Sequence, residues 1–396
     1  MSLFRNKYEK ILYASSAIDE QDFSKLFSTS INKPGQQAQK FNRMMMSGFY
    51  DNGMKVIAIS TPPITKKNYK KIFLKLKSKK IDGINFQYIA TINVPIIKNI
   101  INIIIVFCKV IKFGKDKNAI IVCDVLNASV AYGSSIAGKI LNLPIVGIVT
   151  DIPELMVTGH TARQVRMINH ILSNCTHFVF LTDAMNNRIN FLNKPYVVIE
   201  GICDVQCEKS EKITNSNCIY AGLLDELYGV KKLVNAFILA NVPNHELHIY
   251  GDGPYADELK KISEKNDNII YHGVVMNDEV MEAEKKAKLL INPRPSNEEF
   301  TKFSFPSKNL EYMSTGTAVL STKLPGMPGE YFEYIYTFDD ESVEGMSNRI
   351  KNLLSITEDE LIKKGLSAQM YVKKNKNKSI QTNKILNMLR KSNISI

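Results

Sequence analysis

Lys308 and Glu311 stand three residues apart at the start of a predicted short helix. Pro306 and Ser307 indicate the helix start, by a fixed φ and by side-chain capping, and Gly316 can end the helix in the left-handed conformation. Free backbone N–H groups and the positive end of the helix dipole attract phosphate at such a start. A cation for a diphosphate and a carboxylate for ribose hydroxyls, on one helix face, suit a nucleotide-sugar. The alternative is a solvated Lys–Glu pair without a ligand.

The segment around this helix resembles the donor-binding signature of a known enzyme family. From Pro306 to Val319 the chain reads Pro-Ser-Lys-x-x-Glu-Tyr-Met-x-x-Gly-x-x-Val, which is similar to the signature of the retaining glycosyltransferases of family 4. The resemblance implies the GT-B fold, an α/β architecture of two Rossmann-like, doubly wound domains that face each other across a cleft. It also implies that the C-terminal domain holds a nucleotide-sugar as donor substrate, with no metal and no other cofactor.

The chain departs from the family pattern at an acidic position. The family usually has a glutamate eight residues before the one that Glu311 matches, and here that position is Phe303. Glu298 and Glu299 lie just upstream, so we expect a longer loop to supply the missing acid. The sequence leaves open which of the two does so.

A second departure concerns basic residues. The arginine and lysine that the family carries in the first turn of its C-terminal domain fall on Leu223 and Tyr228. Without them, we expect Lys308 and Arg294 to neutralise the phosphate charge. The same departure supports an alternative in which the chain binds a nucleotide-sugar without turning it over.

The second half of the chain alternates apolar runs with amphipathic stretches, the pattern of a parallel sheet covered by helices. Strands are predicted at 218–221, 247–250, 269–275, 289–292 and 318–320, and further helices at 229–237 and 279–288. Open parallel sheets bind ligands at the carboxyl ends of their strands. With the resemblance, the predicted donor-binding residues of this half are Gly222, Gly251, Gly253, Gly273, Val274, Arg294, Phe305, Pro306, Ser307, Lys308 and Glu311.

The first half shows the same alternation, with predicted strands at 11–15, 55–60, 119–123, 145–149, 178–181 and 196–199. A loop containing Gly35 leads into a predicted helix at 38–50, and such a helix start can approach a phosphate. Family 4 enzymes commonly have a glycine loop here, which implies that Gly35 contacts the donor diphosphate. A plain loop glycine is the alternative.

Asp151 follows the predicted strand at 145–149, where many family members have a histidine. We predict that Asp151 orients an acceptor hydroxyl or accepts its proton, with a helix cap as the alternative. The predicted catalytic residues are therefore Asp151, Glu298, Glu299 and Lys308.

The repeated pattern divides the chain into three predicted parts. An N-terminal acceptor-binding domain is expected at 1–205, a C-terminal nucleotide-sugar domain at 206–370 with a polar linker at 208–217, and a final helical segment at 371–396. The length of 396 residues suits two ordinary domains. In GT-B enzymes the last helix returns to pack on the N-terminal domain, and the resemblance implies the same here.

The formal net charge of +12 lies in the first half, where residues 1–200 contain 26 Lys+Arg and 12 Asp+Glu. Eight lysines interleave with apolar residues between Lys66 and Lys80, a pattern suited to an anionic membrane surface. A solvated helix face is the alternative. The apolar stretch 94–113 is interrupted by polar residues, so we expect a core or interfacial helix, with core favoured, and not a spanning one. No nucleic-acid-binding motif is present, and no nucleic acid partner is expected.

The six cysteines are scattered and form no CxxC pair. This pattern favours a reduced protein and argues against a zinc site. The first residues lack the apolar region of a secretory signal. We therefore expect a cytoplasmic protein that is peripheral on the inner face of the cell membrane.

With the resemblance, these features predict a hexosyltransferase-type glycosyltransferase (EC 2.4). It would transfer a sugar from a nucleotide-sugar to a lipid-linked saccharide in the synthesis of a bacterial surface polysaccharide, such as a capsule or exopolysaccharide. One alternative is a nucleotide-sugar epimerase of the same fold, which would need acid and base residues but no acceptor groove. Another is a non-catalytic module that binds a nucleotide-sugar or saccharide.

Overall fold

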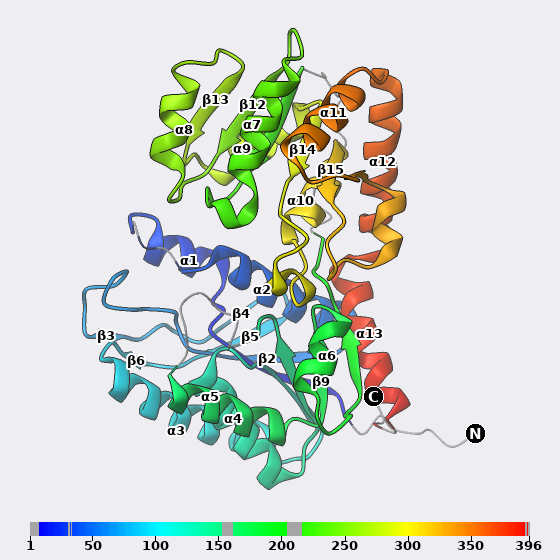
Figure 1. The fold of residues 1–396 in the computed structure, drawn as a ribbon. Coiled ribbons are helices and arrows are strands. Elements are labelled where there is room, and N and C mark those ends of the chain that lie inside the picture. The colour runs from blue at the N-terminus through cyan, green and yellow to red at the C-terminus, as the bar shows by residue number, and fades with distance from the viewer. Residues whose placement is uncertain are drawn as a thin grey trace. The chain divides into compact units, whose positions relative to one another are not determined.

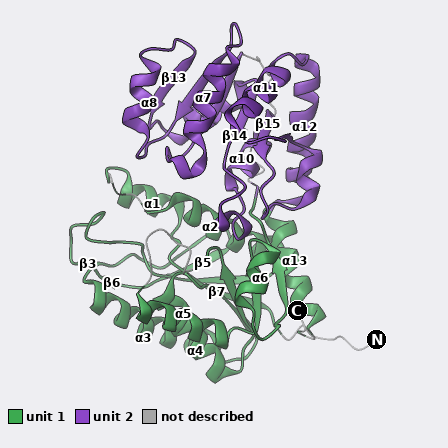
Figure 2. Cartoon of the chain, viewed as in Figure 1, with its two compact units in different colours: residues 1–202, 378–396 green, residues 203–377 purple. Residues whose placement is uncertain are grey.

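The computed structural model describes residues 8–30, 32, 34–152, 161–203, 216–392 and 394. The chain forms two compact units, which Figure 2 shows in different colours. Unit 1 comprises residues 1–202 and 378–396, and unit 2 comprises residues 203–377. The chain thus returns to unit 1 for its last helix. Most of the predicted linker, residues 208–215, lies outside the described residues.

An eight-stranded sheet forms the centre of the described part of unit 1 (Figure 1). Its order is β10-β9-β8-β7-β1-β2-β5-β4, and its strand pairs are parallel except for β4 with β5. Strands β1, β7 and β8 are almost fully buried, as expected for a parallel sheet that helices cover on both faces. The strands are β1 (Lys10–Ser15), β2 (Lys55–Ser60), β4 (Lys79–Ile81), β5 (Ile84–Tyr88), β7 (Ala119–Asp124), β8 (Ile145–Val149), β9 (His177–Phe180) and β10 (Tyr196–Val198).

Helices cover this sheet, and two of them pack closely because a glycine faces the neighbouring backbone. A Cβ on Gly133 would lie 2.5 Å from the carbonyl oxygen of Ile103, so only a glycine allows α4 this close to α3. The helices of unit 1 are α1 (Glu20–Phe27), α2 (Gln36–Asp51), α3 (Pro95–Gly114), α4 (Ala128–Leu141), α5 (Ala162–Asn174), α6 (Asp183–Ile189) and α13 (Lys378–Lys391).

The last helix, α13, packs against α2. A Cβ on Gly48 would lie 2.4 Å from the carbonyl oxygen of Lys378, so this glycine lets the two helices approach. The side-chain amide of Asn52 donates to the carbonyl oxygen of Ser379 at 2.9 Å and to Thr382 Oγ1 at 2.9 Å. These contacts fix the end of the chain on an element more than 300 residues earlier.

A short antiparallel ribbon of β3 (Phe73–Leu74) and β6 (Thr91–Ile92) precedes α3. Residues 66–80 contain a turn, β3 and the start of β4, and no helix. The alternative of a solvated helix face is therefore wrong, because this segment pairs with β6 and β5. The expectation of a core helix at 94–113 holds for one face of α3 only, since several of its isoleucines are exposed.

The described part of unit 2 contains a six-stranded parallel sheet in the order β13-β12-β11-β14-β15-β16. The strands are β11 (Asn217–Ala221), β12 (Glu246–Tyr250), β13 (Ile269–Gly273), β14 (Leu289–Asn292), β15 (Ala318–Thr322) and β16 (Tyr336–Phe338). The α-helices are α7 (Val230–Ala240), α8 (Ala256–Ser263), α9 (Asn277–Lys286), α10 (Ser307–Thr315), α11 (Val343–Leu354) and α12 (Glu358–Asn375), with short 3₁₀ turns at η2 (Glu226–Tyr228), η3 (Glu299–Lys302) and η4 (Gly329–Glu333).

Two apolar cores lie on the two sides of this sheet. Leu233, Phe237 and Ile350 belong to the core under α7 and α11, and Leu310 and Met313 of α10 belong to the other. Leu310 and Met313 stand three residues apart and thus form one buried stripe on α10. Both faces of the sheet are buried, and ligands can approach only its edges or strand ends.

Candidate active site

Three glycine turns meet at the carboxyl ends of β11, β12 and β13. The Gly222 N–H donates to the carbonyl oxygen of Tyr250 at 2.8 Å, and the Gly251 N–H donates to that of Gly273 at 2.8 Å. Gly251 has φ +130°, and a Cβ there would lie 1.8 Å from the carbonyl oxygen of Gly222. A side chain cannot be accommodated at Gly251. The glycine turns therefore pack closely, and this edge of the sheet is lined by backbone atoms.

Lys308 lies in the first turn of α10 and reaches the turn after β11. A Cβ on Gly222 would be 2.4 Å from Lys308 Cε and 2.7 Å from its Nζ. Within the part of the chain that the structure describes, Nζ makes no hydrogen bond and no ion pair within 4.0 Å. Burial lowers the pKa of Lys308, against the opposing effects of Glu311 and Glu284. A bound anion would stabilise the charge of a desolvated ammonium of this kind.

Buried polar contacts hold α10 in place. The Tyr312 hydroxyl accepts a hydrogen bond from the Ala221 N–H at 3.0 Å, which joins the helix to the end of β11. The Asn309 side chain accepts from the Asn292 amide at 2.8 Å and donates to Ser321 Oγ at 3.1 Å, so it bridges β14 and β15. These contacts fix the half-buried Lys308 and Glu311 relative to the strand ends.

The start of α10 differs in detail from the prediction. Pro306 is the N-cap residue, no side chain caps the helix, and Ser307 is its exposed first residue. The predicted side-chain cap by Ser307 is therefore wrong, because Ser307 already has helical backbone. Gly316 ends the helix with φ +76°, as predicted. Phe305 is buried against the ring of Tyr331, with centroids 5.1 Å apart, so it packs in the core below the helix start.

Glu284 of α9 is a charged neighbour that the sequence interpretation missed. Its side chain is only 6% exposed. Burial raises the pKa of Glu284 to about 8, the Glu311 carboxylate adds to this, and Lys308 opposes it. Glu284 lies one residue after Ala283 and three before Ala287, on the apolar face of its helix. An acidic residue among the apolar positions of a helix is the sequence signal that could have identified Glu284 as a candidate.

Arg294 is held by aromatic rings. Its guanidinium lies 4.9 Å from the ring centroid of Tyr228 and 5.6 Å from that of Phe300, and it donates to Ser304 Oγ at 3.5 Å. Tyr228, which stands where a basic residue was expected, thus stacks on the arginine. Arg294 also contributes to lowering the pKa of Lys308, so the two cations share one electrostatic environment.

The loop between β14 and α10 contains the two candidate acids. Glu298 is half-buried and precedes η3, and Glu299 is the exposed first residue of η3. The Thr301 hydroxyl donates to the carbonyl oxygen of Glu298 at 2.6 Å, which fixes this turn. Phe303, at the position where an acid is usual, ends η3 and is half-buried. Glu298 is therefore the more enclosed of the two carboxylates.

The remaining predicted residues of unit 2 lie along the same edge. The Gly253 N–H donates to Asp252 Oδ1 at 2.8 Å within the turn after β12. Gly273 has φ +68°, and Val274 directly after it is 75% exposed. An exposed apolar side chain after a strand end can contact a flat ligand such as a nucleobase.

In unit 1, Asp151 is exposed just after β8. Burial raises the pKa of Asp124, at the end of the neighbouring β7, to about 6, and the charge of Asp151 adds to this, while hydrogen bonds from Leu126, Asn127 and Asn42 lower it. Asp124 was not predicted, because it follows an apolar run that indicates only a strand. Two carboxyl groups thus lie at adjacent strand ends.

Gly35 is the N-cap residue of α2 with φ −54°, and nothing lies within 4 Å of a Cβ built there. Neither the backbone nor the packing of the described residues requires a glycine at this position. This leaves both the donor-contacting and the plain-loop interpretations of Gly35 open.

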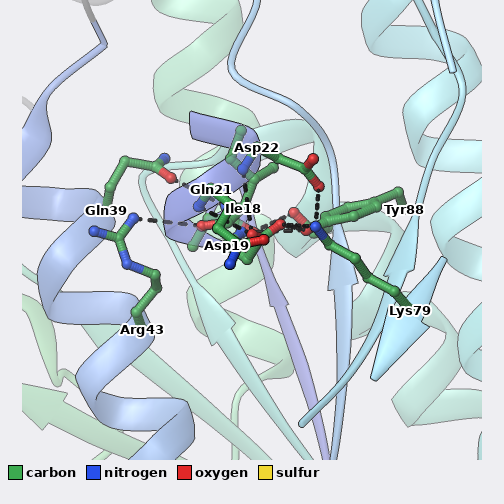
Figure 3. A network of polar contacts seen from close by, with 10 residues as sticks. Ile18, Asp19, Gln21, Asp22, Gln39, Arg43, Lys79 and Tyr88 are labelled. Carbon is green, nitrogen blue, oxygen red and sulfur yellow. Dashed lines mark hydrogen bonds and ion pairs between the residues drawn. The ribbon is translucent and has the colours of Figure 1, made fainter. Parts of the chain in front are cut away.

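A polar network fixes the loop after β1 (Figure 3). Asp19 accepts from the Tyr88 hydroxyl at 2.6 Å, and Lys79 Nζ lies 2.8 Å from a carboxylate oxygen of Asp19 and 2.8 Å from one of Asp22. Burial would raise the pKa of Asp19, but hydrogen bonds from its partners bring it to about 2. The Arg43 guanidinium donates to the carbonyl oxygen of Ile18 at 3.4 Å. This network joins the 66–80 segment to the start of α1, which follows the loop after β1.

Comparisons with known proteins bear on the fold and on unit 2. Residues 215–355 match the family described as Glycosyl transferases group 1. No curated protein was found to match the sequence. Among solved structures, the Anabaena protein HepE in complex with UDP is similar with TM-score 0.64 and 14% identity, over 96% of this chain and 100% of that one.

Two further solved structures are similar to this chain over nearly their whole length. TarM, from S. aureus, is similar with TM-score 0.65 and 12% identity, over 96% of this chain and 98% of that one. The lipopolysaccharide outer core galactosyltransferase WaaB is similar with TM-score 0.60 and 13% identity, over 97% of this chain and 99% of that one. The chain has the GT-B fold. Together with the matched domain, the GT-B fold supports an enzyme of the glycosyltransferase class, EC 2.4.

Proposed function

We propose that this chain is a retaining glycosyltransferase of family 4 that uses a nucleotide-sugar donor and a lipid-linked saccharide acceptor. The observation that carries the proposal is the Lys308 ammonium, which is half-buried beside the Gly222 backbone without an anionic partner within 4.0 Å among the described residues. Similar structures support the donor class, since HepE is described in complex with UDP and with UDP-glucose. The pathway we infer is the synthesis of a bacterial surface polysaccharide.

The donor residues of unit 2 divide into two roles. Lys308, Arg294 and the N–H groups at the start of α10 would stabilise the negative charge that develops on the departing diphosphate. Glu311, one helical turn from Lys308, would accept hydrogen bonds from the ribose hydroxyls. Glu298 or Glu299 would supply the acid that the family usually places at the position of Phe303. None of these roles requires a metal ion, and we propose that transfer proceeds without one.

The acceptor residues are assigned to unit 1. Asp151 would orient the acceptor hydroxyl or accept its proton as the new glycosidic bond forms. In a retaining reaction the hydroxyl oxygen bonds to the sugar on the face from which the nucleoside diphosphate departs, so positioning and electrostatics supply most of the rate. Burial raises the pKa of Asp124 at the neighbouring strand end and the charge of Asp151 adds to this, so a second carboxyl group lies near enough to interact with Asp151.

We also propose that the protein is peripheral on the inner face of the cell membrane, through the lysine-rich segment Lys66–Lys80. A lipid-linked acceptor would lie in that membrane, and exposed lysines attract anionic lipid headgroups. Among the described residues, no helix combines the length and apolarity needed to cross a bilayer.

A donor screen tests the proposal. The protein is incubated with UDP-, GDP- and dTDP-sugars, with and without saccharide acceptors and with and without EDTA, and release of nucleoside diphosphate is followed. Acceptor-dependent release with retained anomeric configuration is the expected result. Sugar interconversion without release would identify an epimerase, and binding without turnover would identify a binding module. Loss of release in EDTA would contradict the metal-free reaction.

A further inference from the structure

All of the net positive charge of the chain lies in one stretch of unit 1. Residues 52–115 contain thirteen lysines and one acidic residue, Asp82, a net charge of +12, whereas the rest of the chain has 38 basic and 38 acidic residues. This stretch runs from β2 through the β3–β6 ribbon to the end of α3. A stretch of chain in which nearly all charged residues are lysines is suited to binding an anionic partner.

The same stretch exposes a row of isoleucines along α3. Ile96, Ile97, Ile100 and Ile104 are 72%, 48%, 50% and 55% exposed. Ile96, Ile100 and Ile104 follow one another at intervals of four residues, and Ile97 precedes Ile100 by three, which places all four on one side of the helix. Asn102, Val106 and Val110 of α3 are buried, so α3 is packed on one side and apolar on the other. A contiguous apolar row of this kind marks an interaction surface.

The ribbon places two more apolar side chains near the start of α3. Ile72 and Phe73 are 69% and 55% exposed. The Asn93 N–H donates to the carbonyl oxygen of Ile72 at 2.6 Å, and the Asn93 side-chain amide donates to that of Tyr69 at 2.7 Å. Since α3 begins at Pro95, these bonds hold the lysine-rich segment against the N-terminal end of the helix. Figure 1 shows β3, β6 and α3 side by side in unit 1.

The lysines of the segment are available for an external anion. Lys79 pairs with Asp19 and Asp22 and so fixes the segment to the unit (Figure 3). The other lysines of 66–80 are exposed and make no ion pair or hydrogen bond within the described ranges: Lys66, Lys67, Lys70, Lys71, Lys75, Lys77 and Lys80.

We propose that the exposed isoleucines of α3, with Ile72 and Phe73, insert into an anionic lipid bilayer while these seven lysines bind its headgroups. We call this surface the lipid face. The proposal deepens the membrane association proposed above, because it adds an apolar component and a second element, α3. A nucleic acid would use the lysines but leave the isoleucines in water. A bilayer interface satisfies both, since an amphipathic helix in the interface buries its apolar face while basic residues contact headgroups.

The test uses the full chain and vesicles of either pure phosphatidylcholine or phosphatidylcholine with 30% phosphatidylglycerol as probe. The chain contains no tryptophan, so Ile100→Trp introduces a single fluorescent reporter. We expect its emission to shift to the blue with the anionic vesicles and not with the neutral ones. Ile140→Trp is the matched control, because Ile140 is a 61% exposed isoleucine of α4 outside the lipid face; its emission should not move.

Sedimentation with the same vesicles measures the contribution of the isoleucines. Exchange of Ile96, Ile100 and Ile104 for Gln should lower the partition coefficient at least 100-fold, and Ile140→Gln should leave it unchanged. Charge reversal of Lys66, Lys67, Lys70 and Lys71 should abolish binding at low salt. Wild-type binding to neutral vesicles as strong as to anionic ones, or unaltered binding of the triple variant, would overturn the proposal.

The same preparation separates the two proposals. A protein that transfers sugar to a soluble saccharide but binds neither vesicle would refute the lipid face and leave the transferase standing. A protein that binds anionic vesicles but releases no nucleoside diphosphate would refute the transferase and support the lipid face. Displacement of the protein from vesicles by an oligonucleotide, together with no shift for Ile100→Trp, would favour a nucleic acid and reject the lipid face.

Discussion

The side chain of Lys308 occupies the space in which a side chain at Gly222 would stand. A Cβ at Gly222 would lie 2.4 Å from Lys308 Cε and 2.7 Å from Nζ. The glycine therefore determines where the ammonium can rest, at the carboxyl end of β11. Lys308 lies on α10. The Tyr312 hydroxyl of the same helix accepts a hydrogen bond from the N–H of Ala221, the residue before Gly222.

Gly222→Ala tests this relationship. The added methyl group must displace the Lys308 side chain. We therefore expect the donor KM to rise about tenfold or more, which corresponds to the loss of one charge-assisted hydrogen bond. Steady-state kinetics with the donor identified by the screen measure it. Gly329→Ala is the control, because no atom lies within 4 Å of a Cβ there. An unaltered donor KM in Gly222→Ala would show that the ammonium does not act from this position.

Lys308→Met removes the charge itself. We expect the donor KM to rise about 10- to 100-fold, with a lower kcat, because the lysine interacts with the diphosphate both when bound and when departing. The matched control is Lys261→Met on the exposed face of α8. Equal donor kinetics in the two variants would remove Lys308 from the phosphate site.

Glu284→Gln should change how stability depends on pH. The pKa of Glu284 is raised from 4.5 to about 8 in the folded protein. Between these values the unfolded chain releases a proton that the folded chain keeps, so wild-type stability falls by up to about 1.4 kcal/mol per pH unit from this group. Glutamine does not titrate, so the variant should lose less stability than wild type between pH 5 and pH 8.

Urea unfolding at several pH values measures this effect. Glu282→Gln is a suitable control, because Glu282 lies on the same helix but is exposed and paired with Lys285. Parallel stability–pH curves for wild type and Glu284→Gln would contradict a raised pKa for Glu284.

Asp151→Asn should separate transfer from donor binding. If Asp151 positions the acceptor hydroxyl or accepts its proton, kcat should fall about 100-fold or more while the donor dissociation constant stays within twofold. Initial rates and calorimetric titration with the nucleoside diphosphate measure the two quantities. Asp183→Asn in unit 1 is the control, since Asp183 lies in the first turn of another helix, α6. A full rate in Asp151→Asn would leave Asp151 as a structural residue.

The fold was largely predictable because its signals are local. Predicted strands 55–60, 145–149 and 289–292 coincide with β2, β8 and β14, each a short apolar run bounded by turn residues. The end of α10 at Gly316 followed from the freedom of glycine to adopt a positive φ. Lys308 and Glu311 were found because they share one turn of that helix.

Apart from the cap assigned to Ser307, the errors and omissions involve contacts between distant segments. Lys79 meets Asp19 and Asp22 only after β4 pairs beside β5, and no local pattern in 66–80 indicates that pairing. Glu284 and Lys308 influence each other's pKa because α9 packs beside α10, about twenty residues later in the chain. Asp124 ends an apolar strand, so its sequence neighbours give no sign of the carboxyl group at the next strand end.

The confinement of the net charge to residues 52–115 has a kinetic consequence. A molecule with +12 in one stretch and no net charge elsewhere has a large permanent dipole. Near an anionic surface the electric field exerts a torque on this dipole, so the protein would be turned with α3 and the β3–β6 ribbon foremost before any contact forms. Because the Debye length is about 8 Å at physiological ionic strength, this orientation acts only over the last nanometre of approach. Added salt should therefore slow association more than it speeds dissociation.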